Sequence, residues 1–323
     1  MQSQWIFDRS KRTRLWISGK DRAKFLHNLC TQDINGMSAG QGREAFITSH
    51  QGRTLAYITA HAERERLLIR ADAGCLAAVM PHLRKYGIFD DVEFDDVTET
   101  TAEWHLAGPD SEAILQSLGI EPGQAGNLGI LSNPDSLEAP ILIREAPYGV
   151  EGWTLIGPSG ESTPWLASLR AKQASMAGAL PTEAELEGLR ILAGLPRFGH
   201  DFTEANLPQE VDRNDQTISF NKGCYLGQET VARLDALGHV NKILRLLKID
   251  GTEPPALGAV VRVGTREAGE ITSVGVTLGG EILAFGMLKV NVAPAGAEVE
   301  VSLRSRSTKA QVEPLPHAGG SQN

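Results

Sequence analysis

The stretch ISFNKGCYLGQETVAR, residues 218–233, contains one of the three cysteines in a chain of 323 residues. Gly223 and Gly227 flank its central Cys-Tyr-Leu. Glycine lets a backbone adopt a positive φ or approach another group closely, so a loop of this composition can hold the thiol of Cys224 out to solvent. On spacing alone, a buried structural cysteine explains the pattern equally well.

Charged residues lie close to Cys224 in the sequence. Lys222 and Arg233 are cations, and a neighbouring cation favours the reactive thiolate form of a cysteine. Glu229 acts in the opposite direction. Reactivity of this thiol is therefore a hypothesis that the sequence alone leaves open.

Composition predicts an ordinary globular protein of roughly two domains, with 41% hydrophobic and 22% charged residues. The formal net charge is −9 and no run of five basic residues occurs, so direct binding to nucleic acid is not expected. The first residues lack the apolar core of a signal peptide, and no stretch of about 18 apolar residues is present. We expect a cytosolic protein with no membrane partner.

The other cysteines and the histidines predict no metal site of the protein's own. Cys30, Cys75 and Cys224 are scattered and form no Cys-x-x-Cys pair, which argues against a disulfide framework or a four-cysteine site. The eight histidines form no His-x-x-x-His pair. Cys30 and Cys75 fall in expected helices, and we predict that they are core residues.

Short apolar strands and amphipathic helices alternate through the first part of the chain. LWIS, EAFITS, TLAYITA and RLLIRA have the pattern of strands, and VEFDDV closes the group. Helices are expected over KDRAKFLHNL and CLAAVMPHLRKY. These elements predict a first α+β unit, residues 1–100.

The next part of the chain repeats this arrangement loosely. WHLA, ILIREA and WTLIG have the pattern of strands, and SEAILQSL and TPWLASLRAKQ have that of helices. Thr182 and Glu185 have the spacing of a capping box that opens a further helix. We predict a second α+β unit, residues 101–239, that includes the loop of Cys224.

The character of the sequence changes after residue 239. ILRLLKI, AVVRV, AGEITSVGVT, EILAFGML and AEVEVSL are short strand patterns separated by Gly and Pro turns. They predict a small β-barrel over residues 240–313, followed by a disordered tail, 314–323. The predicted fold class is α+β with a C-terminal β-barrel.

A polar stretch, residues 196–233, joins the last expected helix to the barrel. Long polar connections between domains often line binding clefts, although a plain surface crossover is the simpler interpretation. His200 and Asp201 within it are interpreted as a solvated turn. Four acidic residues near the end of the first unit are interpreted as a solvated strand edge, and not as a cation site: Asp90, Asp91, Asp95 and Asp96.

Residues 218–233 closely resemble the signature of the YgfZ family, which reads Lys-Gly-Cys-Tyr-x-Gly-Gln-Glu and then, after two variable positions, Ala-Arg. The match covers nine positions: Lys222, Gly223, Cys224, Tyr225, Gly227, Gln228, Glu229, Ala232 and Arg233. Four further segments extend the likeness over most of the chain: GKDRAKFLHNLCTQDI, HQGRTLAYI, RILAGLPRFGHDFTEANLPQE and AGEITSVG.

This family is related to the aminomethyltransferase, or T-protein, of the glycine cleavage system. The resemblance implies tandem ferredoxin-like units and a β-barrel around a folate-binding central cleft. It implies a tetrahydrofolate-binding accessory protein that helps to assemble or repair iron-sulfur enzymes, mainly [4Fe-4S] enzymes. Its partners would be folate and the client enzymes or assembly proteins, and tRNA modification would be supported indirectly. A monomer is expected.

The resemblance also assigns roles to residues. Cys224 would be the signature thiol, with a possible transient contact to an iron-sulfur cluster, and Lys222 and Tyr225 would accompany it in catalysis. Glu210 would bind the pterin or the substrate. The remaining candidates for cofactor binding are Gln228, Glu229, Arg233, Lys242 and Arg245, the last three for the folate's glutamate tail. Gly223 and Gly227 would shape the loop.

Two departures from the related T-proteins bear on function. T-proteins carry an aspartate pair where this chain has Leu55 and Ala56. Neither side chain can stabilise an amine or shuttle a proton, which argues against aminomethyl transfer. Trp16 is offset from the position at which some relatives carry a tryptophan near the folate. Two alternatives remain, a folate-dependent aminomethyltransferase or demethylase, and an interaction module that has lost its ligand.

Overall fold

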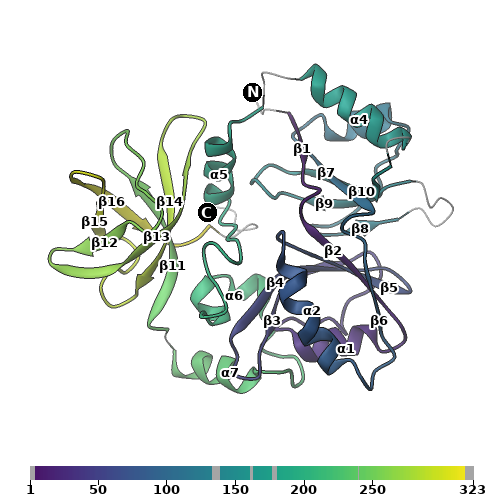
Figure 1. Cartoon of the computed structure of the whole chain (residues 1–323), viewed down its shortest axis with the longest axis horizontal. Coiled ribbons are helices and arrows are strands. Elements are labelled where there is room, and N and C mark those ends of the chain that lie inside the picture. Colours follow the sequence, from purple (N-terminus) through teal and green to yellow (C-terminus); the bar gives the residue numbers. More distant parts are fainter. Residues whose placement is uncertain (1–3, 133–138, 161–162, 177–179, 239, 317–323) are drawn as a thin grey trace.

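Three sheets organise the chain in the computed structural model, which describes residues 4–132, 139–160, 163–176, 180–238 and 240–316. Two of the sheets have five strands each and the third is closed into a barrel. Figure 1 shows the barrel on one side of the molecule and the two open sheets, one above the other, on the opposite side. The predicted α+β fold with a C-terminal barrel is confirmed.

The first sheet has the order β3-β4-β5-β2-β6 and is antiparallel throughout. Its strands are β2 (Thr13–Ser18), β3 (Gly42–Thr48), β4 (Thr54–Ala62), β5 (Arg66–Ala71) and β6 (Glu93–Asp96). Two helices, α1 (Arg22–Leu29) and α2 (Cys75–Tyr86), share a core with the sheet. All seven elements coincide with predicted ones.

The second sheet has the order β1-β7-β10-β9-β8. Its strands are β1 (Trp5–Asp8), β7 (Thr101–Ala107), β8 (Ile130–Leu131), β9 (Ile141–Glu145) and β10 (Gly152–Pro158), accompanied by α3 (Ser111–Ser117) and α4 (Pro164–Ser175). Pairing of β1 with β7 corrects the predicted division, because the first strand of the chain belongs to the second unit. Local patterns carry no information about such a long-range partner.

The closed barrel has the order β11-β14-β13-β12-β15-β16. Its strands are β11 (Lys242–Ile249), β12 (Val260–Val263), β13 (Arg266–Val276), β14 (Ile282–Lys289), β15 (Glu298–Ser302) and β16 (Ser307–Glu313). The predicted tail begins too early, because Leu315 is 1% exposed and packs with Ile191. The rest of that tail, residues 317–323, lies outside the described residues.

Helix α5 (Glu183–Leu192) joins the open sheets to the barrel. The predicted capping box of Thr182 and Glu185 starts this helix. Its backbone lies directly on β13, because a Cβ on Gly188 would stand 2.1 Å from the carbonyl oxygen of Val276. A Cβ on Gly275 would stand 2.2 Å from the nitrogen of Gly188. This pair of glycines permits a close approach that fixes α5 against the barrel.

The polar connection between α5 and the barrel forms three short helices. They are the 3₁₀ helix η1 (Pro208–Val211), α6 (Asn214–Thr217) and α7 (Gln228–Leu237). The segment before them is pinned to the barrel by Asp201, which is 1% exposed and accepts hydrogen bonds from Arg190 and Ser273. The interpretation of Asp201 as part of a solvated turn is therefore wrong, since its partners come from elements distant in sequence.

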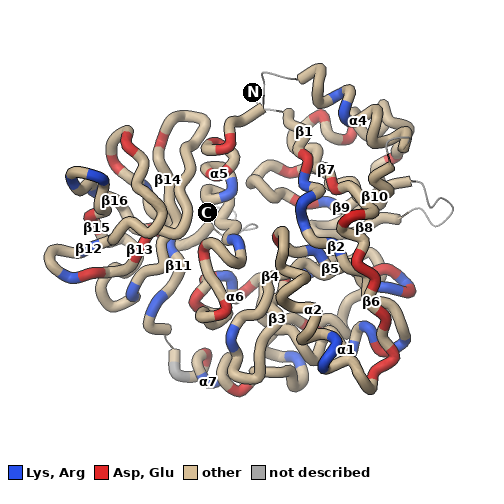
Figure 2. Tube along the Cα trace, in the orientation of Figure 1, with Lys and Arg blue, Asp and Glu red and all other residues tan. Residues whose placement is uncertain are grey.

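The four acidic residues near the end of the first unit lie on or beside β6, the last strand of its sheet. Figure 2 shows the acidic colour running along this strand. Glu93, Asp95 and Asp96 are exposed there. The predicted solvated strand edge is confirmed. An edge rich in charge is also protected against pairing with another sheet.

A buried ionic network joins the two open sheets. The guanidinium of Arg70 on β5 donates to Glu103 on β7 at 2.7 and 3.2 Å and to Glu145 on β9 at 2.7 and 3.0 Å. Arg9 bonds Glu145 at 3.0 Å, and Arg12 bonds Glu103 at 3.3 Å. Such pairs cost desolvation, so the network specifies how the sheets fit together more than it adds stability.

Acidification should destabilise the protein progressively below about pH 6.5. Burial lowers the pKa of His61 and His105 to about 3, so the unfolded chain binds protons in this window that the folded chain excludes. Burial raises the pKa of Glu103, but Arg70 outweighs it and brings the pKa to about 2. The ionised Glu103 carboxylate therefore stabilises the folded state fully above the ordinary carboxyl pKa, and this contribution is lost as the pH falls through about 2.

Urea unfolding at pH 7 and pH 4.5 measures this effect. The midpoint should be lower at pH 4.5, and replacing His105 by glutamine should reduce the difference. Replacing the exposed His50 in the same way is the control and should leave the difference unchanged. A midpoint that is equal or higher at pH 4.5 contradicts the assignment of His61 and His105 as buried neutral groups.

Candidate functional site

A cavity of about 570 Å³ lies where the two open sheets meet α5. The cavity is lined by the β1–β2 turn, by the paired strands β3 and β4, by the segment after β9, and by α5 with the connection that follows it. Cavities of ~300–1,000 Å³ are typical of small-molecule sites. The size of the cavity fits a small-molecule ligand.

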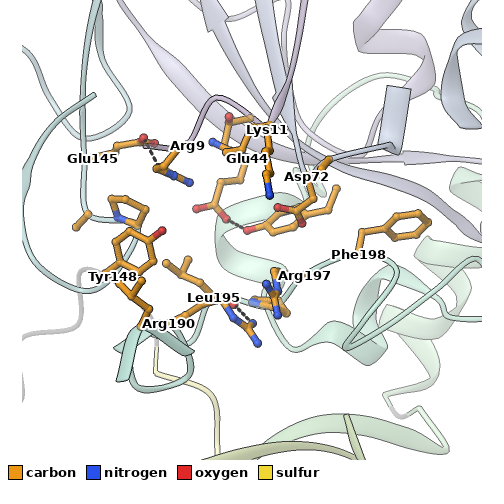
Figure 3. Close-up of a pocket in the computed structure, with 18 of the residues that line it drawn as sticks. Arg9, Lys11, Glu44, Asp72, Glu145, Tyr148, Arg190, Leu195, Arg197 and Phe198 are labelled. Atoms are coloured by element: carbon orange, nitrogen blue, oxygen red, sulfur yellow. Dashed lines mark hydrogen bonds and ion pairs between the residues drawn. The ribbon is translucent and has the colours of Figure 1, made fainter. Parts of the chain in front are cut away.

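The walls of the cavity carry opposite charges and aromatic rings. In Figure 3, Arg9 and Lys11 lie on one side, and Arg190 and Arg197 lie on the other. Tyr148 contributes an aromatic surface, as does Phe198. Arg9, Arg190 and Arg197 are held in ion pairs with Glu145 or Glu187. Lys11 has no ion pair within the described part of the chain, so its charge is available to a ligand.

A three-residue cluster forms part of the β3–β4 wall. The Oε2 atom of Glu44 accepts from the hydroxyl of Tyr57 at 2.5 Å and from Nη2 and Nε of Arg213 at 2.7 and 3.2 Å. Burial raises the pKa of Tyr57 well above its ordinary value, which keeps the hydroxyl protonated as a donor. Burial lowers the pKa of Arg213, but Tyr57 and Glu44 outweigh it, so the guanidinium stays charged.

Strand register explains why these side chains meet. Glu44 on β3 pairs with Thr59 on β4, and Phe46 pairs with Tyr57. Residues two apart along a strand share a face, so Glu44 lies diagonally next to Tyr57. Arg213 enters from the connection after η1 and also donates to the carbonyl of Gly194 at 2.8 Å. Sequence reasoning missed the cluster because its three members are far apart in the chain.

The signature loop lies away from this cavity, against α1. Lys222 is buried, and its Nζ donates to the backbone carbonyls of His27, Cys30 and Gln32, the last two at 2.7 and 2.9 Å. All three ammonium donors are therefore used at the C-terminal end of α1. Lys222 thus ties the loop to the helix, and its catalytic role stays a prediction.

One of the two signature glycines is required by the backbone. Gly227 has φ +84°, and a Cβ there would stand 2.4 Å from the carbonyl oxygen of Ser49 and 2.8 Å from Gly52. Gly223 has no positive φ, and the nearest atom to an added Cβ is 4.0 Å away. The prediction that both glycines shape the loop thus holds for Gly227 alone. Gly227 docks the loop on the β3–β4 turn.

Cys224 is exposed, whereas Cys30 and Cys75 are buried. Burial raises the pKa of the Cys30 thiol and raises that of Cys75 to about 12, which leaves both as inert core residues, as predicted. Cys224 lines a small surface pocket of about 310 Å³ together with Phe25 and Tyr86. The structure therefore favours the presented thiol over the buried structural cysteine.

The neighbours of Cys224 divide between core and surface. Tyr225 is 8% exposed and packs with Val231, so it supports the loop. Gln228 accepts a hydrogen bond from the Tyr225 nitrogen at 3.3 Å. Glu229 and Arg233 are exposed on α7. None of them lines the large cavity, and their predicted contacts with a cofactor are not supported by their position.

The remaining predicted cofactor ligands contact each other or neighbouring residues of the chain. Glu210 accepts from Asn206 at 2.8 Å and from the Leu207 nitrogen at 3.2 Å, and Lys242 lies 3.9 Å from it. Arg245 pairs with Asp212. The residues around the cavity do not include them. Their assignment as cofactor ligands stays a prediction.

Neither of the two positions that lack the expected acids lines the cavity. Ala56 is fully buried in the core of the first unit, and Leu55 packs against that core. Trp16 stacks under Arg66, with 3.6 Å between the guanidinium carbon and the ring centroid. His200, in contrast, lines the cavity. Within the described ranges no three His, Cys, Asp or Glu side chains gather in a way that could hold a metal ion.

Comparisons with known proteins agree on one family. The family described as the GCVT N-terminal domain matches residues 1–222. A protein described as "Putative transferase At1g60990, chloroplastic" from Arabidopsis thaliana is 30% identical over 92% of this chain and 68% of its own length. An aminomethyltransferase from Rubrobacter xylanophilus is 27% identical over 96% of this chain and 82% of its own.

Solved structures show the same fold. The glycine cleavage system aminomethyltransferase T of Bartonella henselae matches with a TM-score of 0.80 at 20% identity, over 97% of this chain and 86% of that one. At this identity the match establishes the fold alone. No helix among the residues that the structure describes is both long and apolar enough to cross a membrane.

Proposed function

Because the chain belongs to the GCVT N-terminal domain family, we propose that it binds tetrahydrofolate or a derivative in the cavity between its two open sheets. The observation that carries this proposal is the cavity itself, which lies within the matched residues and combines aromatic rings with charges of both signs. A pterin offers a flat ring with N–H donors, and the folate tail offers carboxylates. Both kinds of group find complementary side chains here.

Calorimetry with folinic acid tests this proposal. Saturable binding is expected, and Lys11→Ala should weaken it about fivefold, since one exposed charge pair at ~4 Å is worth about 1 kcal/mol in water. Lys172→Ala, which removes an exposed lysine of α4, is the control and should change nothing. Absence of heat at high folinic acid concentration contradicts the proposal and favours an interaction module without ligand.

We propose further that the protein is a YgfZ-type accessory factor for iron-sulfur enzymes. Cys224 supports this role because its thiol is exposed beside a pocket. Ile88 and Phe89 are 70% and 98% exposed. In the sequence they lie between Tyr86 and Asp90, which both line that pocket. Exposed apolar side chains of this kind are typical of protein interaction surfaces. The cytosolic location and the monomeric state stay predictions.

Deletion of the gene tests the accessory role. Aconitase-type and tRNA-thiomethylation activities should fall under oxidative stress, and normal levels of both contradict the role. Complementation with Cys224→Ala should fail, whereas Asn221→Ala, an exposed neighbour in the same loop, should complement fully. Full complementation by the Cys224 variant removes the thiol from the mechanism and leaves a role for the folded domain.

An aminomethyltransferase or demethylase of the T-protein type is the second candidate. Its support is the carboxylate of Glu44, which lies at the cavity wall although positions 55 and 56 carry no acid. Measuring methylene-tetrahydrofolate formation from N-methyl substrates decides between the transferase and the accessory factor. Turnover that Glu44→Gln abolishes establishes the transferase, and no turnover leaves the accessory role.

A further inference from the structure

The carboxylate of Glu44 is satisfied on one oxygen only. Its Oε2 atom accepts from Tyr57 and twice from Arg213, whereas Oε1 has no hydrogen-bond partner among the residues described. The side chain is 14% exposed. In Figure 3 its carboxylate points into the cavity. An oxygen with two free lone pairs therefore faces the space that a ligand would occupy.

The rest of the cluster holds this oxygen in place. Arg213 is fully buried and is anchored through the Gly194 carbonyl. The ring of Tyr57 packs against Phe46 and Phe202, with centroids 5.2 and 6.2 Å apart. Two rigid donors thus fix the orientation of Glu44 before any ligand arrives. A prearranged acceptor loses little freedom on binding, which favours both affinity and selectivity.

The other cavity acids differ from Glu44 in this respect. Both Glu145 and Glu187 have their oxygens engaged by arginines. Asp72 has no side-chain hydrogen bond or ion pair within the described ranges, so no neighbour fixes its carboxylate. Two further acids line the cavity, Asp8 and Glu183, and both are exposed to solvent. Of the six acids, Glu44 alone combines an oxygen without a partner among the described residues with an anchor to a fully buried arginine.

We propose that Glu44 determines ligand specificity by accepting a hydrogen bond from an amino group on the ligand's ring. The inference rests on the proposed folate-binding function and names the side chain that would recognise the pterin's exocyclic amine. Tyr57 and Arg213 are positioning residues that act through Glu44.

Pterin and lumazine provide the test. They share the bicyclic ring, but lumazine carries a carbonyl oxygen where pterin carries the amino group. If lumazine bound in the same orientation, this carbonyl oxygen would face Oε1 of Glu44. Both atoms are hydrogen-bond acceptors, so no hydrogen bond could form between them. The wild-type protein should therefore bind pterin about tenfold to a hundredfold more tightly than lumazine, as expected for a hydrogen bond to a charged group. Glu44→Gln should abolish this preference.

Matched variants define the outcomes. Glu65→Gln removes an exposed glutamate outside the cavity and should keep the full preference for pterin. Retention of the preference in Glu44→Gln, or its loss in Asp72→Asn instead, overturns the assignment to Glu44. If Glu44→Gln does not fold, Glu44→Asp is the second variant. It keeps the charge but shortens the side chain, so that the carboxylate lies further from the ligand. An unchanged preference in that variant overturns the proposal as well.

Failure of the inference is distinguishable from failure of the proposed function. Wild-type protein that binds folinic acid and pterin but does not distinguish pterin from lumazine overturns the role of Glu44 and leaves folate binding standing. Wild-type protein that binds neither folinic acid nor pterin overturns folate binding, and the inference with it. Calorimetry on the full chain reports all of these outcomes.

Discussion

Replacing Glu103 by glutamine should lower the free energy of unfolding by about 3–5 kcal/mol, the usual cost of removing one partner from a buried ion pair. The substitution keeps the size of the side chain and removes only its charge. Glu103 is fully buried and bonds Arg70 and Arg12, and Arg14 approaches it within 3.7 Å. Without its charge, Arg14 and Arg70 remain buried with Glu145 as the nearby anion.

The expected loss of stability arises because the Glu103 ion pairs are buried, and an exposed ion pair provides the comparison. Glu151 forms an ion pair of 2.7 Å with Arg144, but both side chains are exposed. Glu151→Gln should therefore cost less than about 1 kcal/mol. Urea unfolding at pH 7 measures both variants. Equal losses for the two substitutions contradict the view that the network between the sheets depends on its burial.

Replacing Gly227 by alanine should destabilise the protein by roughly 2–4 kcal/mol, combining the cost of a left-handed backbone with that of overpacking. The added Cβ would lie 2.4 Å from the Ser49 carbonyl oxygen and 2.8 Å from the backbone of Gly52. Backbone atoms on both sides leave no flexible group that could give way. The loop should separate from the β3–β4 turn, and Cys224 should lose its fixed position.

Gly223→Ala is the control within the same signature. It adds the same methyl group where the nearest atom is 4.0 Å away and where φ is not positive. Its effect on unfolding should stay within about 0.5 kcal/mol, as for ordinary surface substitutions. Thermal unfolding compares the two variants directly. If both glycines tolerate alanine, the close approach of Gly227 to Gly52 does not hold the loop.

Sequence periodicity predicted most of the helices and strands but not all of their partners. The elements of the first sheet were recognisable because most of them have a pronounced apolar pattern. The long-range pairing of β1 with β7 was not, since a four-residue strand carries no mark of its partner. The Leu315 anchor was also missed. A single apolar side chain between prolines has no periodicity, and only its neighbours in space show that it is buried.

Some features of the candidate site could likewise be predicted from the sequence and others could not. Spacing and glycine content allowed a presented thiol at Cys224 but explained a buried cysteine equally well, and the structure shows that Cys224 is exposed. The motif did not show that the polar ends of Lys222, Glu210 and Arg245 turn to backbone carbonyls or to neighbouring side chains. It also gave no sign of Glu44, whose significance depends on Tyr57 across the strand pair and on Arg213 far along the chain.

The sequence by itself determined the fold class and the relationship to the aminomethyltransferases, because these follow from local periodicity and from fixed spacing between residues. Only the tertiary structure decided where a ligand would lie and which charges would meet it. The physical reason is that a binding cavity is built from side chains brought together by long-range packing. Whether a carboxylate is free or engaged depends on neighbours that no local pattern records.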